Sequence, residues 1–155
     1  VFCYNHHELW MHLNESRRKS EIDYYKSFEK TKTPFYCIFG GNTIHDKEIG
    51  KFIENKYLKV NIGDRAFPDT DYPITISDYV ITTRISSKTA QKIEQCFKNT
   101  NSLKELEQQI SQIGLEKVKI KLIIERNKEK AKKIRKRIAR DFHVPKELRD
   151  KYELF

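Results

Sequence analysis

A continuous apolar run, FYCIF at 35–39, lies between Pro34 and Gly40 and is typical of a buried β-strand. Other runs rich in β-branched and apolar residues predict further strands, and segments with apolar residues at helical spacing predict helices. The expected strands lie at 1–4, 35–39, 58–62, 74–85 (one interrupted strand or two) and 117–124. The expected helices lie at 6–32 (with a weak point near 14–16), 43–57, 86–99, 102–114, 126–144 and 146–155.

Strands and helices alternate along the chain, and this order favours an α/β or α+β fold. We predict a mixed sheet of about four to six strands flanked by helices, with a long basic C-terminal helix and a short final helix. A chain of 155 residues with 12% aromatic content is large enough for one folded domain. We divide it into an α/β body at 1–124 and a basic helical extension at 125–155, packed on the same domain.

The cysteines and the hydropathy of the chain bear on its compartment. Cys3, Cys37 and Cys96 are dispersed and odd in number, which indicates small buried residues in a reducing compartment. No apolar run approaches membrane-spanning length, so we expect no membrane span. We find no signal peptide, and we expect an intracellular protein of the cytoplasm or an organelle matrix. The first residue is Val1 rather than methionine, which indicates a processed, trimmed or partial chain.

The segment 126–140 holds most of the net positive charge, with nine Lys or Arg residues against one Glu. The whole chain has a formal net charge of +9, so the remainder is close to neutral. On a helical wheel, an apolar arc of roughly 80° is left, and basic residues cover the rest. The arc consists of Ala131, Ile134, Ile138 and Phe142. Like charges at neighbouring positions repel one another, and a nucleic-acid backbone would relieve this repulsion by binding there.

We therefore predict a nucleic-acid-binding surface on this helix. The basic triplet RRK at 17–19 extends the surface if it folds nearby, and is otherwise a solvated helix face. The predicted contact residues are Arg126, Lys128, Lys130, Lys132, Lys133, Arg135, Lys136, Arg137, Arg140, Arg17, Arg18 and Lys19. Two other interpretations remain open: a solvated helix in an AT-rich proteome, and a surface for acidic proteins or membranes.

The segment RIARDFHVPKELRDKYEL (137–154) loosely resembles a helix-turn-helix, the motif that places its second helix in the DNA major groove. An Ile-Ala pair is followed by a turn and a second helical stretch. His143 stands where glycine is usual in the turn, and Arg149 falls on an apolar position of the second helix. The alternative is a helix that Pro145 interrupts.

Two other segments resemble known sites without completing their motifs. In HHELWMH, His7 and His12 are five residues apart and miss the four-residue spacing of zinc proteases. We expect exposed histidines that flank Trp10 instead. The segment FGGNTIHDK resembles a phosphate-binding strand, turn and helix, but it lacks the required glycine pattern. A tight strand exit at 40–41 is the simpler interpretation.

These features predict a non-catalytic nucleic-acid-binding protein, with RNA preferred over DNA. A nearly neutral body with a basic helical extension suits a structural component of a ribonucleoprotein particle such as a ribosome. Other proteins of that assembly are then further partners. We predict no catalytic residue, metal ligand or cofactor. The first alternative is a transcription regulator, with an α/β sensor body and DNA contacts from the segment that resembles a helix-turn-helix.

The second alternative is a metal-dependent nuclease, because clustered carboxylates can bind Mg²⁺. The acid-x-Lys pair that such a site needs on the next strand is missing from YVITTRI at 79–85. A solvated loop is therefore the simpler interpretation. The aspartates concerned are Asp64, Asp69, Asp71 and Asp78.

Overall fold

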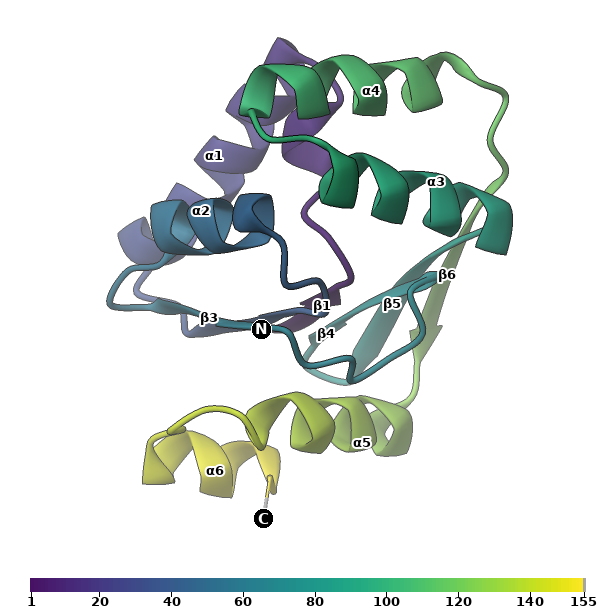
Figure 1. Ribbon diagram of the computed structural model, residues 1–155. Helices are drawn as coiled ribbons and strands as arrows, with labels where there is room; N and C mark the ends of the chain where they lie inside the picture. The colour runs from purple at the N-terminus through teal and green to yellow at the C-terminus, as the bar shows by residue number, and fades with distance from the viewer. Residues whose placement is uncertain (155) are drawn as a thin grey trace.

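The computed structural model describes residues 1–154 as a six-stranded mixed sheet with helices on both faces (Figure 1). The strand order is β3-β2-β1-β4-β5-β6. β1, β2 and β3 are parallel, whereas β4, β5 and β6 pair in antiparallel fashion. The strands are β1 (Phe2–Asn5), β2 (Phe35–Phe39), β3 (Leu58–Ile62), β4 (Asp71–Ile76), β5 (Tyr79–Ile85) and β6 (Ile120–Arg126). The predicted mixed sheet flanked by helices is confirmed.

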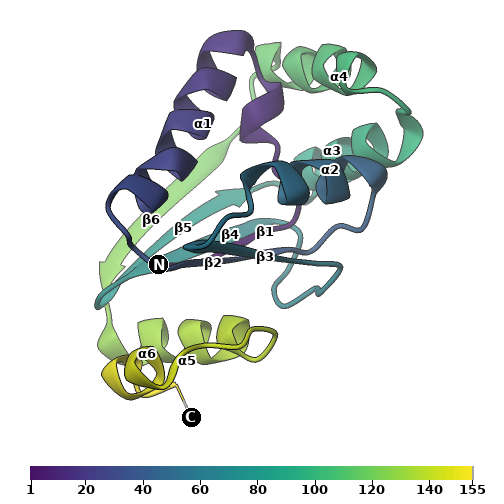
Figure 2. The same cartoon turned by 90° about the vertical axis from the view of Figure 1, so that its left-hand side faces the viewer.

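Helices α1 to α4 and the short 3-10 helix η1 lie over one face of the sheet, and α5 and α6 lie under the other (Figures 1 and 2). Their bounds are η1 (Trp10–His12), α1 (Glu15–Lys30), α2 (Ile44–Ile53), α3 (Ser87–Asn99), α4 (Leu103–Leu115), α5 (Lys128–Ala139) and α6 (Lys146–Tyr152). Within residues 1–154, no helix combines the length and the apolar character that crossing a membrane requires.

The apolar run of β2 is explained by helices on both sides of the sheet. Phe35, Cys37 and Phe39 belong to the core beneath α1 and α2, whereas Tyr36 and Ile38 belong to the core above α5. Successive strand residues point to opposite faces, so a strand covered on both faces is apolar throughout.

The three cysteines are buried and unpaired. Cys3 and Cys37 are directly opposite each other on the neighbouring strands β1 and β2. Cys96 lies on α3, in the core that this helix forms with α4. Their burial agrees with the prediction that they act as small core residues.

The strand order reverses at β1: β2 and β3 are added on one side of it, and β4, β5 and β6 on the other. Its neighbour on one side is the parallel strand β2, and on the other side the antiparallel strand β4. In α/β proteins, ligand sites commonly lie at the carboxyl ends of strands at such a reversal. His6 and His7 directly follow β1, and Gly40 and Gly41 follow β2 at the same edge.

The helix expected at 6–32 starts later than predicted. Residues 6–9 are not helical, and α1 begins after Asn14, whose side chain accepts a hydrogen bond from the Arg17 amide at 2.9 Å. The Gly41 amide donates to the His6 carbonyl at 2.6 Å, so the chain beyond β1 remains bonded to the chain beyond β2. This tertiary hydrogen bond overrides the local helical pattern.

The expected long basic helix is not confirmed, because α5 has 12 residues and ends at Ala139. Its apolar side packs on the sheet: Ala131, Ile134 and Ile138 are buried, as the narrow apolar arc predicted. Phe142 lies beyond the end of the helix and packs partly buried against the same core.

The strand β6 lies at the edge of the sheet and exposes an apolar row. Ile120, Leu122 and Ile124 are 50%, 60% and 62% exposed. Alternation along this strand predicts one buried and one solvated face, but here the apolar positions are the exposed ones. Within the described residues, β5 is the only element with which β6 makes extensive contact. An edge strand without a covering helix cannot bury its apolar side.

Candidate functional site

The basic residues of α5 do not all face solvent. Arg135 is 5% exposed, and its guanidinium donates a hydrogen bond to the Ser77 carbonyl and lies 5.3 Å from the ring centroid of Tyr152. Burial lowers the pKa of Arg135. This predicted phosphate contact therefore lies inside the protein, where it connects α5 to the β4–β5 turn and to α6.

Four other basic residues of α5 lie beside carboxylates of neighbouring segments. These pairs are Lys128–Glu153, Lys130–Glu125, Lys132–Glu153 and Arg137–Asp64. The Lys128 pair is the loosest, with 4.0 Å between its charged atoms. Exposed pairs of this kind contribute little to stability. They do reduce the repulsion along α5 that the sequence alone suggested.

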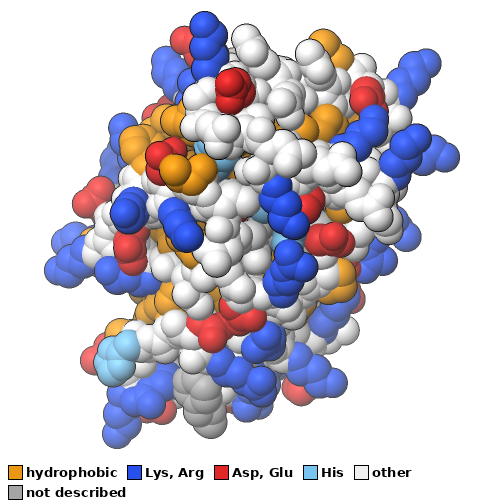
Figure 3. Space-filling model, viewed as in Figure 1, with side chains coloured by type: hydrophobic (Ala, Val, Ile, Leu, Met, Phe, Trp, Pro, Cys, Tyr) orange, Lys and Arg blue, Asp and Glu red, His pale blue; other side chains and the backbone are white. Residues whose placement is uncertain are grey.

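Three basic residues, termed here the α5 stripe, have no acidic partner within residues 1–154. Lys133, Lys136 and Arg140 are three and four positions apart, so they lie on one side of the helix axis. Lys133 and Arg140 are exposed, and Lys136 is half-buried. Figure 3 shows blue Lys and Arg side chains over the lower layer, where α5 and α6 lie, with red Asp and Glu side chains among them.

The basic triplet at 17–19 lies on α1, over the opposite face of the sheet from α5 (Figure 1). Arg17 pairs with Glu21 at 2.6 Å, and Arg18 pairs with Glu107 of α4. Lys19 is exposed. The triplet therefore does not lie near α5 and does not extend its basic surface.

The segment that resembles a helix-turn-helix contains only the last three residues of α5, a short irregular stretch and the seven-residue α6. Pro145 precedes the first residue of α6, and no residue of α6 is fully buried. Val144 and Leu154 on either side of α6 are buried in the core under the sheet.

The aspartates of the second alternative do not form a cluster in the described part of the chain. Asp71 accepts two hydrogen bonds from Arg84, at 2.7 and 2.6 Å, and Asp64 pairs with Arg137 of α5. Asp78 lies in the turn between β4 and β5, away from the loop of Asp69. The arrangement gives no support to a nuclease site in this loop.

A cluster of mostly buried polar side chains lies where β1 and β2 end, beside α3. Glu94 of α3 places Oε2 2.8 Å from His6 Nε2 and 2.7 Å from His7 Nε2. On the other side of the ring, His7 Nδ1 lies 2.9 Å from Asp46 Oδ1. His6, His7 and Asp46 are buried, and the Glu94 side chain is 18% exposed. These four residues are termed the His–Glu cluster.

Neighbouring groups hold His7 and Asp46 in place. Asp46 Oδ2 accepts hydrogen bonds from the backbone N–H of Thr43 at 2.9 Å and from its hydroxyl at 2.7 Å. The His7 ring stacks on Phe97, with 4.1 Å between ring centroids. A Cβ on Gly41 would lie 2.3 Å from His7 Cε1, so this position has no room for a side chain. The Asp46 carboxylate already accepts hydrogen bonds at the N-terminus of α2. The segment FGGNTIHDK therefore forms a tight turn after β2 and leaves no open site for a phosphate.

Burial, hydrogen bonds and charged neighbours together shift the pKa values of Glu94 and His6. Burial opposes ionisation of Glu94, but hydrogen bonds from Lys98, His7 and His6 outweigh it and lower its pKa to about 2. Lys98 Nζ lies 2.7 Å from Glu94, and Arg65 lies at 3.5 Å. Burial, followed by the charge of His7, lowers the pKa of His6. The neutral form of His6 is therefore favoured.

The expectation of exposed histidines beside Trp10 is wrong. His6, His7 and His12 are 3%, 0% and 3% exposed. The position of the histidines could have indicated a site, because two consecutive histidines follow a strand at the edge of the sheet where α/β folds place their ligand sites. Glu94 could not be found in this way, because it is 87 residues further along the chain than His7.

Glu8 occupies a second buried polar site. Its Oε2 accepts hydrogen bonds from Asn5 Nδ2 at 2.7 Å and from Tyr25 Oη at 2.6 Å, whereas Oε1 has no partner within residues 1–154. Burial raises the pKa of Glu8 to about 7. A hollow of about 410 Å³ adjoins it, and Arg17 and Glu21 are among its lining residues.

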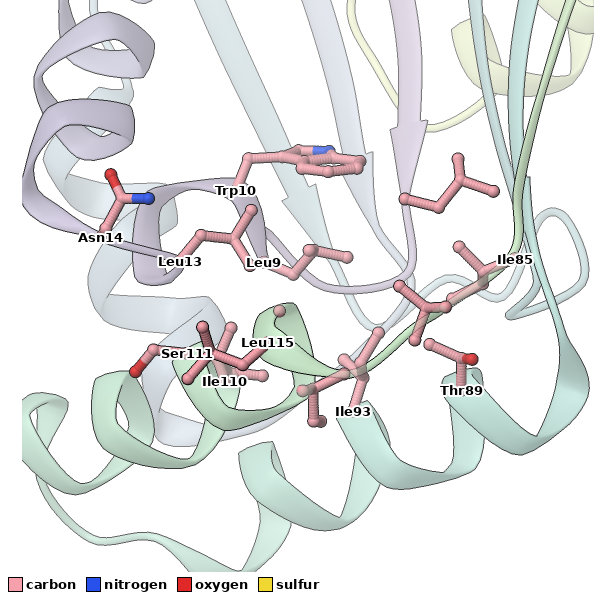
Figure 4. Close-up of a pocket in the computed structure, with 14 residues that line it drawn as sticks. Leu9, Trp10, Leu13, Asn14, Ile85, Thr89, Ile93, Ile110, Ser111 and Leu115 are labelled. Carbon is pink, nitrogen blue, oxygen red and sulfur yellow. The ribbon is translucent and has the colours of Figure 1, made fainter.

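A second hollow, of about 430 Å³, is apolar (Figure 4). Figure 4 shows Leu9, Trp10 and Leu13 on one side of it, and Ile93 and Ile110 on the helices opposite. No Lys, Arg, Asp, Glu or His residue is among those that line it. Since its few polar lining groups are neutral, it offers no acid, base or metal ligand.

Comparison of the chain with protein-family models, curated proteins and solved structures gives no match. The fold itself provides two candidate sites, the α5 stripe and the His–Glu cluster.

Proposed function

We propose that this protein binds nucleic acid, and RNA in particular, through the phosphate backbone at the layer formed by α5 and α6. The observation that carries the proposal is the α5 stripe, in which three cations on one helix side have no acidic partner within residues 1–154. Positive side chains of this kind release counterions from a nucleic acid on binding. A structural place in a ribonucleoprotein particle, beside other proteins, is consistent with this mode of binding.

RNA is preferred because further cations without an acidic partner within residues 1–154 lie on neighbouring segments and do not continue the line of the stripe. Arg126 precedes α5, and Lys146, Arg149 and Lys151 lie on α6. All four are exposed. Phosphates of a folded RNA approach from several directions, whereas those of a duplex groove form two regular rows.

Reversing the charge of the α5 stripe tests this proposal. A variant with Lys133→Glu, Lys136→Glu and Arg140→Glu is expected to bind a structured RNA on the order of 100-fold more weakly at low salt. The slope of log affinity against log salt should fall by about 2, since each lost phosphate contact removes roughly 0.7 to 0.9. Fluorescence anisotropy at several salt concentrations measures both quantities, and duplex DNA of equal length measures the preference for RNA.

The matched control carries the same charge change on the other face of the sheet: Lys26→Glu and Lys30→Glu on α1, and Lys51→Glu on α2. All three lysines are exposed. The control is expected to keep most of the affinity and the salt slope of the parent. Equal losses in the two variants would show that only net charge matters, and the surface proposed here would be wrong.

A further inference from the structure

The His–Glu cluster contains three atoms placed as metal ligands. His6, His7 and Glu94 each offer one ligand atom, and these atoms lie within 4.8 Å of one another. Both Nε2 atoms face Glu94 Oε2, that of His6 at 2.8 Å and that of His7 at 2.7 Å. Two ligands of one zinc ion are at most roughly 4 Å apart, because each bond is about 2.0–2.2 Å long. Glu94 Oε2 now lies at hydrogen-bond distance from both nitrogens, so binding an ion among the three atoms requires small movements of Glu94 and of the rings.

Carboxylates face both ring nitrogens of His7, an arrangement that a cation would stabilise. Its Nδ1 faces Asp46 and its Nε2 faces Glu94, and an ionised carboxylate can only accept hydrogen bonds. A neutral imidazole carries a proton on one nitrogen, so one of the two carboxylates would face a lone pair. A second proton on the ring, or a metal ion between Nε2 and Glu94, removes this repulsion.

Asp46 fixes the orientation of the His7 ring in a way that suits metal binding. When Asp46 accepts the proton of Nδ1, the neutral ring presents the lone pair of Nε2 toward Glu94. A carboxylate behind a ligating histidine is the usual arrangement in metal sites, where it fixes the tautomer and the ring orientation. Asp46 cannot easily turn away, because Thr43 holds its other oxygen.

We infer that His6, His7 and Glu94 bind one divalent transition-metal ion, with Zn²⁺ as the best match. Imidazole ligands favour such ions, whereas Mg²⁺ and Ca²⁺ prefer oxygen ligands. Two histidines and one glutamate leave a fourth position for water or substrate, which is the composition of catalytic and not of closed structural zinc sites.

The position in the fold supports the same inference. The cluster lies at the carboxyl end of β1, where the order of strands reverses. Glu94 also connects the cluster to the surface through Lys98 and Arg65, which are 58% and 68% exposed. The Glu94 side chain is itself 18% exposed, so the cluster reaches the protein surface on this side. This inference does not depend on the proposed nucleic-acid binding.

Equilibrium dialysis of the metal-free full chain against Zn²⁺, with elemental analysis, tests the inference without any nucleic acid. The parent is expected to bind one Zn²⁺ per chain and to show no comparable binding of Mg²⁺. Glu94→Gln and His6→Asn are each expected to weaken Zn²⁺ binding by roughly 100-fold, the upper end of the loss known for groups that only support the ligands. Zn²⁺ should raise the thermal midpoint of the parent and leave that of both variants nearly unchanged.

Two substitutions outside the cluster serve as controls: His143→Asn and Glu48→Gln, both at exposed positions. Both should bind Zn²⁺ as the parent does. Circular dichroism checks folding, and Glu94→Gln keeps the test decisive if His6→Asn does not fold. A parent that binds no Zn²⁺, or a folded Glu94→Gln variant that binds it with unchanged affinity, would overturn the inference. The cluster would then be a hydrogen-bonded core network.

Discussion

A Gly41→Ala variant is expected to lose about 3 kcal/mol of folding free energy, the upper end of the usual cost of overpacking. The added Cβ would lie 2.3 Å from His7 Cε1 and 2.5 Å from Asp46 Oδ2. Neither neighbour can move freely, because the His7 ring is stacked on Phe97 and Asp46 is bonded to Thr43. Urea unfolding of the variant and the parent measures the loss. The same substitution should also weaken Zn²⁺ binding, since it displaces His7.

Gly114→Ala provides the matched control for this substitution. Gly114 lies inside α4, where a Cβ would meet only the end of the Leu13 side chain, at 3.2 Å. Alanine gains roughly 0.8–1.0 kcal/mol of helix propensity over glycine, so this variant should be as stable as the parent or slightly more stable. Should Gly41→Ala unfold at the same urea concentration as Gly114→Ala, the tight contact between Gly41 and the cluster would not exist in solution.

The sheet could be predicted from the sequence because its strands carry strong local signals. FYCIF is apolar throughout, and Pro34 and Gly40 mark its two ends. Helices α3 and α4 were equally clear, since Ser86 and Ser102 accept the amide hydrogen bonds expected of helix caps. The strand order was not predictable in this way, because pairing depends on contacts between residues far apart in the chain.

The His–Glu cluster was missed because its members come from three separate elements. His6 and His7 carry a helical local pattern, and only the hydrogen bond from Gly41 to His6 shows that this part of the chain continues from the strand. In the sequence, nothing distinguishes Glu94 from the other charged residues of the segment that forms α3. The sequence explains Asp46 fully as a capping residue of α2, so it gives no reason to expect the contact of Asp46 with His7.

The number of basic residues in the sequence overstates the positive charge that α5 leaves without an acidic partner within residues 1–154. The sequence shows nine basic residues between Arg126 and Arg140 but not the acids that fold against them. Glu125 and Glu153 approach from the two segments next to α5 in sequence, and Asp64 approaches from the loop before β4. Within residues 1–154, the basic residues left without an acidic partner form a narrower stripe than the sequence suggested, and the proposed RNA binding can be tested with three substitutions.

A Glu8→Gln variant is expected to become more stable than the parent as the pH rises. Burial raises the pKa of Glu8 from 4.5 to about 7, so the folded protein holds a proton that the unfolded chain releases. Below pH 4.5 both states are protonated and the group costs nothing. Between pH 4.5 and about 7 the parent loses stability, by about 3 kcal/mol in all at 1.36 kcal/mol per pH unit, and above pH 7 the loss is constant.

Urea unfolding of the parent and of Glu8→Gln from pH 4 to pH 8 measures this difference. Subtracting the two curves removes the contributions of titrating groups that do not interact with Glu8. The exposed substitution Glu48→Gln controls for the loss of one carboxylate and should follow the parent at every pH. A difference between Glu8→Gln and the parent that is constant with pH would mean that Glu8 ionises normally in the folded protein. Water would then reach it through the adjoining hollow, and Asn5 and Tyr25 would hold a carboxylate and not a carboxylic acid.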